Sequence, residues 1–273
     1  TPMALADLAR VLQQGLPLPE RSVVFTIDDG FKDQFECAGP LFARYEAPLT
    51  CFVITGFLDG ELWPWDDQIP YIFRGARNRR FALELPGGKT EQIDLDTQDA
   101  GRLASALRDR LKTLPQDALY PWLSRLYAAA AVDEPSEPPP DMQPMSWPEA
   151  RRFIAMGHAI APHTRTHRIL SQLSDAASHA EISDSAARVL TETEKRSAIF
   201  AYPTGRLQDF GAREMSVLGE QGIGCAVSTD PRAVLGGDRI HALPRYSLPD
   251  TVEDFAQYLG FFEVLKARLR AQR

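Results

Sequence analysis

The sequence predicts an α/β protein with a barrel-like core of parallel strands, on two observations. Short apolar segments alternate with longer segments of helical character, which favours parallel strands joined by helical crossovers in an open sheet or a barrel. The alternation breaks once, in the middle of the chain, and no repeat of fixed period is present. We therefore predict that residues 1–273 form one domain with an insertion at about residues 67–145.

The first part of the chain predicts a strand, a helix and a second strand. Residues 22–27 form an apolar run without charge, as expected for a strand buried on both faces, and the run ends in Asp28 and Asp29. A helix-compatible segment over residues 33–45 follows. A second apolar run over residues 50–55 predicts the next strand.

The middle of the chain predicts a separate insertion. Residues 80–85 and 92–95 flank the turn sequence PGGK and indicate a hairpin, and residues 97–114 and 117–130 indicate two helices. Residues 133–148 contain six of the 21 prolines, which is typical of a stiff connector.

The alternation resumes after the connector. Ser146 and Glu149 match the capping-box pattern at the start of a helix, and Gly157 is expected to end that helix. The remaining predicted elements are strands over residues 158–161, 198–202 and 223–228, and helices over residues 174–193, 210–221 and from Asp250 onward.

The composition argues against several functional classes. Thirty basic and 37 acidic residues give a net charge of -7, so we expect no nucleic-acid partner. No apolar run approaches the roughly 18 residues of a membrane span. Cys37, Cys51 and Cys225 lie in apolar stretches and are predicted to be buried free thiols.

These features favour a cytoplasmic protein. The first ten residues show no basic segment followed by an apolar core, which a signal peptide would require. The alternative is that the natural start is missing and an export signal was removed with it.

Polar side chains end three of the predicted strands. Asp28 and Asp29 follow the first, His163 and His167 follow the strand over residues 158–161, and the sequence PTGR follows the strand over residues 198–202. The carboxyl ends of parallel strands are where α/β proteins bind ligands. If these ends meet, two imidazoles and a carboxylate can hold a divalent ion with an open position for water.

A purely structural interpretation of each motif stays open. Asp-Asp-Gly is an ordinary turn sequence after a strand, and the two histidines at positions i and i+4 can be capping or surface residues. Two adjacent acids at the end of a buried strand nevertheless need a cation or hydrogen bonds to compensate them, which favours the functional interpretation.

Three segments together resemble the polysaccharide deacetylases of carbohydrate esterase family four, which are related to the nodulation-factor chitooligosaccharide deacetylases. They are residues 24–31 (VFTIDDGF), 163–167 (HTRTH) and 200–205 (FAYPTG). Residues 63–66 (WPWD) and 243–245 (LPR) are similar to the branch found with bacterial exopolysaccharide and glycoconjugate synthesis.

The resemblance implies a distorted (β/α) barrel of about seven parallel strands and one divalent ion, with zinc as the default. Asp29, His163 and His167 would be the metal ligands, and Asp28 the general base toward a metal-bound water. The backbone N–H of Thr204 would help to stabilise the oxyanion.

The remaining roles are less closely tied to motifs. Arg245 or Arg206 would orient Asp28. Many family members place a histidine as general acid near the last strand, where this chain has Leu-Pro-Arg, so His241 becomes the candidate, with a plain loop histidine as the alternative. The candidate substrate-binding residues are Tyr202, Pro203, Thr204, Trp63 and Trp65, the two tryptophans as a sugar-stacking wall or as packing residues.

The predicted function is a metal-dependent hydrolase that removes N-acetyl groups from amino sugars of a polysaccharide or glycan precursor, so the expected partner is an N-acetylated carbohydrate. Two alternatives remain open. One is an amide or formamide hydrolase acting on a small molecule, and the other is a catalytically inactive carbohydrate-binding protein on the same fold. His158 and His179 are expected to be structural.

Overall fold

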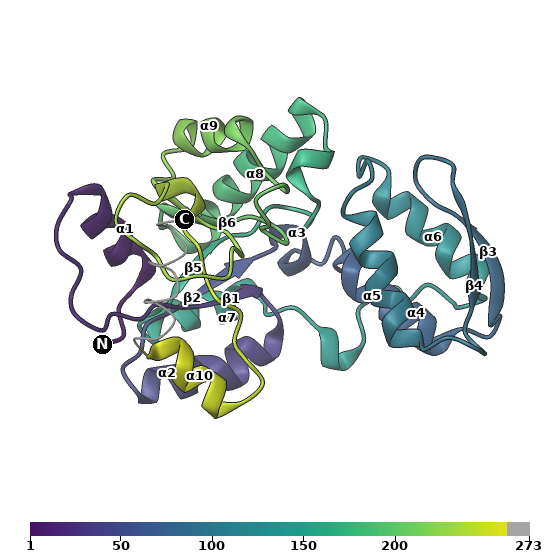
Figure 1. Cartoon of the computed structure of the whole chain (residues 1–273), viewed down its shortest axis with the longest axis horizontal. Coiled ribbons are helices and arrows are strands. Elements are labelled where there is room, and N and C mark those ends of the chain that lie inside the picture. Colours follow the sequence, from purple (N-terminus) through teal and green to yellow (C-terminus); the bar gives the residue numbers. More distant parts are fainter. Residues whose placement is uncertain (261–273) are drawn as a thin grey trace.

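The computed structural model of the chain describes residues 1–260, and its centre is a set of short parallel strands (Figure 1). Strands β1 (Phe25–Asp29), β2 (Leu49–Val53) and β5 (Ala159–Pro162) form a parallel sheet in the order β1-β2-β5. Strands β6 (Ile199–Ala201) and β7 (Cys225–Val227) form a parallel pair, and β6 lies beside β5.

The strand arrangement curves back toward its beginning. Val227 of β7 forms a parallel bridge with Leu243, and Arg245, two residues further on, donates hydrogen bonds to Asp28 at the end of β1. The mixed α/β fold with parallel strands agrees with the prediction. The described residues supply five parallel strands and this bridge, so a barrel of about seven strands is not confirmed.

Helices surround the strands. They are α1 (Leu5–Gln13), α2 (Gly39–Arg44), α3 (Thr55–Leu58), α7 (Trp147–Ala155), α8 (Asp175–Thr193), α9 (Ala212–Glu220) and α10 (Val252–Leu259), with a π-helical segment at Gln34–Ala38 and 3-10 turns at Pro140–Met142, Leu170–Gln172 and Ile240–Ala242. Helix α7 begins with the predicted capping box, because Ser146 accepts from the Glu149 N–H and Glu149 accepts from the Ser146 N–H.

The first strand differs from its prediction. It includes Asp28 and Asp29 instead of ending before them, and all five of its residues are half-buried, whereas every residue of β2 is buried. The residues of β1 are less buried than those of β2 because β2 lies between two strands, whereas β1 pairs with β2 alone. The end of β1 with the two aspartates is therefore less enclosed than the neighbouring strand.

Residues 65–132 form a lobe beside the strands, here called the inserted lobe (Figure 1). It contains the predicted hairpin, β3 (Arg80–Glu84) and β4 (Thr90–Asp94), and the predicted helices, α5 (Ala100–Leu111) and α6 (Leu119–Ala130). Helix α4 (Trp65–Gly75) was not predicted, and it packs on α5 and α6. The lobe has its own apolar core, to which Ile72, Leu107 and Leu126 belong.

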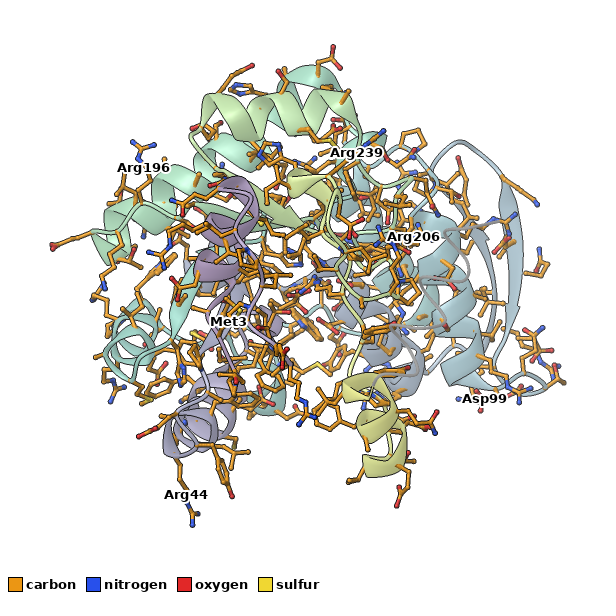
Figure 2. The ribbon with its side chains drawn as sticks, turned by 60° about the vertical axis from the view of Figure 1, so that its left-hand side comes forward. Met3, Arg44, Asp99, Arg196, Arg206 and Arg239 are labelled. Atoms are coloured by element: carbon orange, nitrogen blue, oxygen red, sulfur yellow. The ribbon has the colours of Figure 1, made fainter. Side chains whose placement is uncertain are left out.

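Other sequence predictions have mixed outcomes. Cys51 and Cys225 are buried free thiols as predicted, whereas Cys37 is exposed, so burial was wrong for that residue. Charged side chains such as Arg44 and Arg196 project from the outer surface (Figure 2). Within residues 1–260, no helix has the length and apolar character needed to cross a membrane.

Candidate metal centre and active site

The first and third strands of the main sheet place their polar residues at one edge. In the parallel register Asp29 of β1 lies opposite Val53 of β2, and Val53 lies opposite Pro162 of β5. Asp29 and His163, the residue after Pro162, therefore lie on either side of the end of β2. The His163 N–H donates to the Val53 carbonyl at 2.9 Å, which extends this register to the histidine. Two of the three strand ends that sequence analysis expected to meet, those of Asp29 and His163, therefore do meet.

The loop after β5 has an unusual backbone. Thr164 and His167 have φ of 66° and 56°, and Asp29 opposite them has φ of 84°. Such left-handed conformations of non-glycine residues are strained and cluster at functional sites. His163 and His167 are thus brought together by a loop and not by one turn of a helix, as their spacing suggested.

Glu181 of α8 holds this loop and was missed by sequence analysis. Its carboxylate is 3 % exposed and accepts hydrogen bonds from the backbone N–H groups of Arg165 and Thr166 at 2.9 and 2.8 Å. The Thr166 hydroxyl and the Arg168 guanidinium also bind it. A buried carboxylate with this many donors fixes the loop shape.

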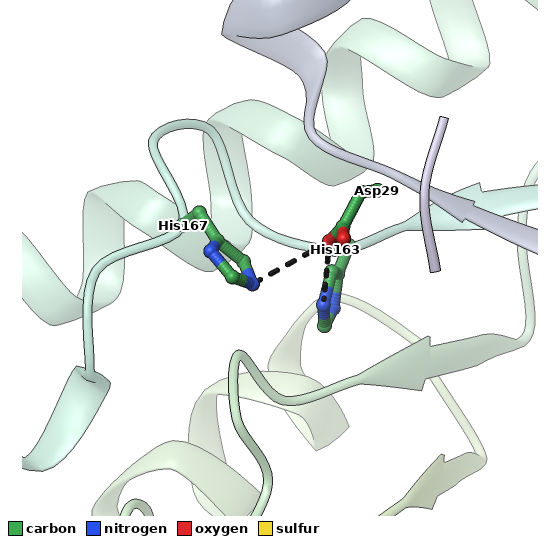
Figure 3. A group of neighbouring side chains, drawn as sticks. All are labelled: Asp29, His163 and His167. Atoms are coloured by element: carbon green, nitrogen blue, oxygen red, sulfur yellow. Dashed lines mark ion pairs between the residues drawn. The ribbon is translucent and has the colours of Figure 1, made fainter. Parts of the chain in front are cut away.

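Three side chains of the loop and β1 converge on one point (Figure 3). The Oδ1 atom of Asp29 lies 3.6 Å from Nε2 of His163 and 3.5 Å from Nε2 of His167. One ligand atom from each residue lies within 4.8 Å of the other two. Asp29 Oδ1 is buried and has no hydrogen-bond partner, so the site contains an acceptor that a cation would satisfy.

The other ring nitrogen of each histidine is occupied. His163 Nδ1 lies 2.7 Å from the Ala201 carbonyl of β6, and His167 Nδ1 lies 3.1 Å from Oδ1 of Asp66 in α4. Both partners are acceptors, so Nδ1 donates in each ring and Nε2 of each ring faces Asp29. Two Nε2 atoms and a carboxylate oxygen form a donor set that suits zinc and other divalent ions.

The pKa values indicate an excess of negative charge at this point. Burial raises the pKa of Asp29 to about 7, and the charges of Asp66 and Asp28 add to the effect. Burial lowers the pKa of His163 to about 4, which keeps that ring neutral, as a metal ligand must be. Burial opposes protonation of His167 too, but the charges of Asp66 and Asp29 outweigh it and raise its pKa to about 10.

Asp28 lies beside the three converging residues and has a cation of its own. Nη1 and Nη2 of Arg245 donate to Oδ1 and Oδ2 of Asp28 at 2.8 and 2.6 Å. Although burial favours the neutral acid, Arg245 and then His163 lower the pKa of Asp28 to about 2. Arg206, the other predicted partner, instead forms a two-point pair with Asp209. Asp28 is therefore ionised and fixed in orientation at neutral pH.

The structure does not bring His241 into this group, which corrects its prediction as general acid. Its Nε2 lies 2.9 Å from the carbonyl of Ile223, which precedes β7, whereas Asp28 and Asp29 lie at the carboxyl ends of the strands. Tyr202 is also directed elsewhere, since its ring stacks on Phe210 and its hydroxyl donates to the His241 carbonyl. Tyr202 is therefore a core residue and not a substrate contact.

The predicted sugar-stacking wall is likewise wrong. Trp63 and Trp65 are 6 % and 0 % exposed. The Trp63 ring packs edge-on against Tyr71, and Nε1 of Trp65 donates to the His167 carbonyl at 2.9 Å. Both indoles are packing residues, and Trp65 in addition supports the loop that carries His167.

Of the two predicted substrate-binding residues in the turn after β6, only Thr204 is partly exposed. Pro203 is buried, while Thr204 is half-buried with φ of 58°. The Gly205 N–H donates to the Pro203 carbonyl and the Thr229 hydroxyl donates to the Thr204 carbonyl, so the turn is fixed from both sides.

Of the other histidines, His158 bonds the backbone of Leu49 and Gly39 in the core, as expected of a structural residue.

Asp66 was missed as a candidate. It lies 101 positions from His167 in the sequence, and the available signals were its place in the WPWD segment and the acidic pair after Trp65. The fold and the site together define an α/β protein with two histidines and two acids gathered beside the ends of its parallel strands.

Comparison with known proteins agrees with this class. The family model for polysaccharide deacetylase matches residues 122–222, which contain the HTRTH and FAYPTG segments. This match confirms the predicted resemblance to polysaccharide deacetylases over that part of the chain. A search of curated protein sequences finds no significant match.

Solved deacetylase structures have a similar fold. The Streptococcus pyogenes deacetylase PplD in complex with acetate has a TM-score of 0.60 and 16 % identity, with 95 % of this chain and 80 % of that chain covered. IcaB from Ammonifex degensii has a TM-score of 0.56 and 14 % identity over 95 % and 82 % of the two chains. The BpsB deacetylase domain from Bordetella bronchiseptica has a TM-score of 0.53 and 14 % identity, with 90 % of this chain and 78 % of that chain covered.

Proposed function

We propose that this chain is a metal-dependent hydrolase that removes N-acetyl groups from amino sugars of a polysaccharide or glycan precursor. The observation that carries the proposal is the convergence of Asp29, His163 and His167 on one point, with Asp28 held separately by Arg245. The polysaccharide deacetylase match and the deacetylase folds support the substrate class.

Asp29 Oδ1 and the Nε2 atoms of His163 and His167 would hold one divalent ion, with zinc the first candidate from the donor set. When bound, such an ion supplies Lewis acidity and lowers the pKa of water. Because both histidines donate through Nδ1 to other partners, their Nε2 atoms are already directed to this point, where an ion would take the place of any proton on Nε2.

Asp28 would act as the general base. Its carboxylate is ionised at neutral pH, and each oxygen can accept a further hydrogen bond besides the one from Arg245. A water proton would pass to one of these oxygens as the water attacks the acetamide carbonyl. Asp28 would then return this proton to the sugar nitrogen, which leaves as the amine when the C–N bond breaks. The backbone N–H of Thr204, in the strained turn after β6, is the proposed donor to the oxyanion.

The decisive experiment measures metal content and acetate release together. We expect about one ion per chain, and acetate release from N-acetylglucosamine oligosaccharides that a chelator suppresses. Asp28→Asn should lower acetate release by about 10²- to 10⁴-fold, the usual contribution of a general base, while metal affinity changes little. His163→Ala should lose the ion, whereas His179→Ala, on the exposed face of α8, is the matched control.

Other outcomes distinguish the alternatives. Loss of both metal and activity in Asp28→Asn would contradict the role given to Asp28. Release of acetate or formate from small amides alone would favour a small-molecule amidase. The position of His241 away from the cluster favours the inactive carbohydrate-binding protein, and oligosaccharide binding without acetate release would establish it.

A further inference from the structure

The inserted lobe contacts the loop that carries His167 through a partly buried carboxylate. Asp66, in the first turn of α4, places Oδ1 3.1 Å from Nδ1 of His167. The side chains are 22 % and 7 % exposed, so the hydrogen bond is largely shielded from water.

The two histidines of the cluster receive their outer partners from different parts of the molecule. His163 is oriented by the Ala201 carbonyl of β6, which belongs to the strand core. His167 is oriented by Asp66, which belongs to the lobe. A carboxylate accepts and does not donate, so Asp66 fixes a proton on Nδ1 and orients Nε2 toward Asp29.

The lobe also holds the backbone of the same loop. Trp65 Nε1 donates to the His167 carbonyl at 2.9 Å, and the Tyr120 hydroxyl donates to the Thr166 carbonyl at 2.7 Å. Next along the chain, the Ile169 N–H donates to Oε1 of Gln116 at 2.6 Å. Ring and backbone of His167 are thus both fixed from α4, α6 and the segment before α6.

We propose that Asp66 is the positioning residue for His167 and that the inserted lobe, through Asp66, Trp65 and Tyr120, completes the metal site. The proposal rests on the proposed function, because it requires that His167 binds an ion. It gives the lobe a role in building the centre instead of a role confined to its own core.

A simpler role for Asp66 is that of an acid in the first turn of a helix, where it would interact with the helix dipole. Asp67 occupies the same turn and shares that property, but it forms no hydrogen bond with His167. Asp66→Asn and Asp67→Asn therefore make the same substitution in the same turn. Only the first removes the hydrogen-bond partner of His167, whereas Asp67 acts on His167 through its charge alone.

The experiment titrates metal-free full-length protein with Zn²⁺ against a chromogenic chelator and measures Kd. Asp66→Asn is expected to bind Zn²⁺ about 10- to 100-fold more weakly, the usual effect of losing an outer partner of a ligand histidine. Asp67→Asn should stay within about threefold of the wild type. Asp66→Glu, which keeps a carboxylate, should recover part of the affinity. The absorption spectrum of bound Co²⁺ should change in Asp66→Asn and not in Asp67→Asn.

Tyr120→Phe removes one hydroxyl and tests independently whether the inserted lobe supports the metal site. It therefore provides the test of the proposal if Asp66→Asn does not fold. We expect Zn²⁺ binding weakened about three- to tenfold, as for loss of one hydrogen bond. Wild-type Kd in a folded Asp66→Asn protein, or in Tyr120→Phe when Asp66→Asn is unfolded, overturns the proposal and leaves the proposed function intact. If the wild type itself binds no ion, the proposed function fails.

Discussion

At the scale of single residues, the pairing of Asp28 with Arg245 joins two positions 217 apart in the sequence. Arg245 also donates to the Thr26 hydroxyl and the Ser228 carbonyl, so the guanidinium is fixed on three sides. A planar fork held in this way orients both carboxylate oxygens, which a lysine could not do. Among the charged partners of Asp28, this distant residue lowers its pKa most.

Arg245→Gln tests this dependence through pH. With Arg245 present, the pKa of Asp28 lies below its ordinary value of 3.8, at about 2, so the pair stabilises the fold fully above pH 3.8 and loses this contribution as pH falls to about 2. In the variant, burial raises the pKa of Asp28 instead, so we expect lower stability at pH 7 and an acid limb of the rate profile moved to higher pH.

The measurements for this prediction are thermal unfolding and acetate release across pH. Arg206→Gln is the control, because Arg206 pairs with Asp209 and not with Asp28. The prediction is contradicted if both variants keep the acid limb of the wild type.

Sequence analysis found the residues at strand ends and missed those that support them. Asp28, Asp29 and His163 could be grouped because each ends a strand of one parallel sheet, a rule that needs no side-chain geometry. Asp66 contributes through helix α4, which begins at Trp65, and nothing in the spacing of the sequence relates it to His167. The indole of Trp65 was assigned to substrate because residue type alone does not reveal burial.

At the scale of elements, α3 connects the end of β2 to the loop that carries the two histidines. The N–H groups of Thr55 and Gly56 donate to the carbonyls of Thr164 and Arg165 at 3.1 and 3.0 Å. A Cβ atom at position 56 would lie 2.7 Å from the Arg165 carbonyl oxygen, which is backbone and cannot rotate away. Glycine is therefore required for this contact.

Gly56→Ala is expected to destabilise the protein by about 2 kcal/mol, because the loop must shift to relieve the overlap. Metal affinity should fall in the same variant. Gly219→Ala in α9 is the control, since its Cβ would meet nothing within 4 Å and helix propensity favours alanine by about 0.5–1 kcal/mol. Chemical denaturation should thus show a lower free energy of unfolding for Gly56→Ala and a higher one for Gly219→Ala. A stability gain in Gly56→Ala would contradict the contact.

Most elements were predictable because they carry strong local signals. The hairpin of the lobe has a Pro-Gly-Gly turn, and α7 has a capping box that the structure confirms. Helix α4 was missed because Pro70 interrupts its interior, where proline normally disfavours a helix. The number of strands around the core was not predictable, since the bridge at Leu243 pairs a single residue.

At the scale of the whole molecule, the candidate centre joins the strand core, helix α8 and the inserted lobe. An ion bound here would contact residues from two strand ends, and these are held by Glu181 and Asp66. Because the three ligands are far apart in an unfolded chain, binding favours the folded state. Stability should therefore depend on the metal.

Removal of the ion by a chelator is expected to lower Tm. At a free metal concentration of about 100 times Kd, the folded state gains about 2.7 kcal/mol, and this gain is lost on chelation. Differential scanning calorimetry with and without chelator measures the change. His163→Ala, which lacks one ligand, should show the same Tm under both conditions, and equal chelator sensitivity of both proteins would show that the ion binds elsewhere.

The insertion between β2 and β5 bears on the order in which the chain folds. These strands are neighbours in the sheet, yet the contact between Leu49 and His158 spans 109 positions. Closing so long a loop costs conformational entropy before any strand contact forms. The lobe core, built from segments near one another in sequence, can collapse early and shorten the effective distance between the two strands. Its folding would then act as a nucleus that precedes sheet assembly.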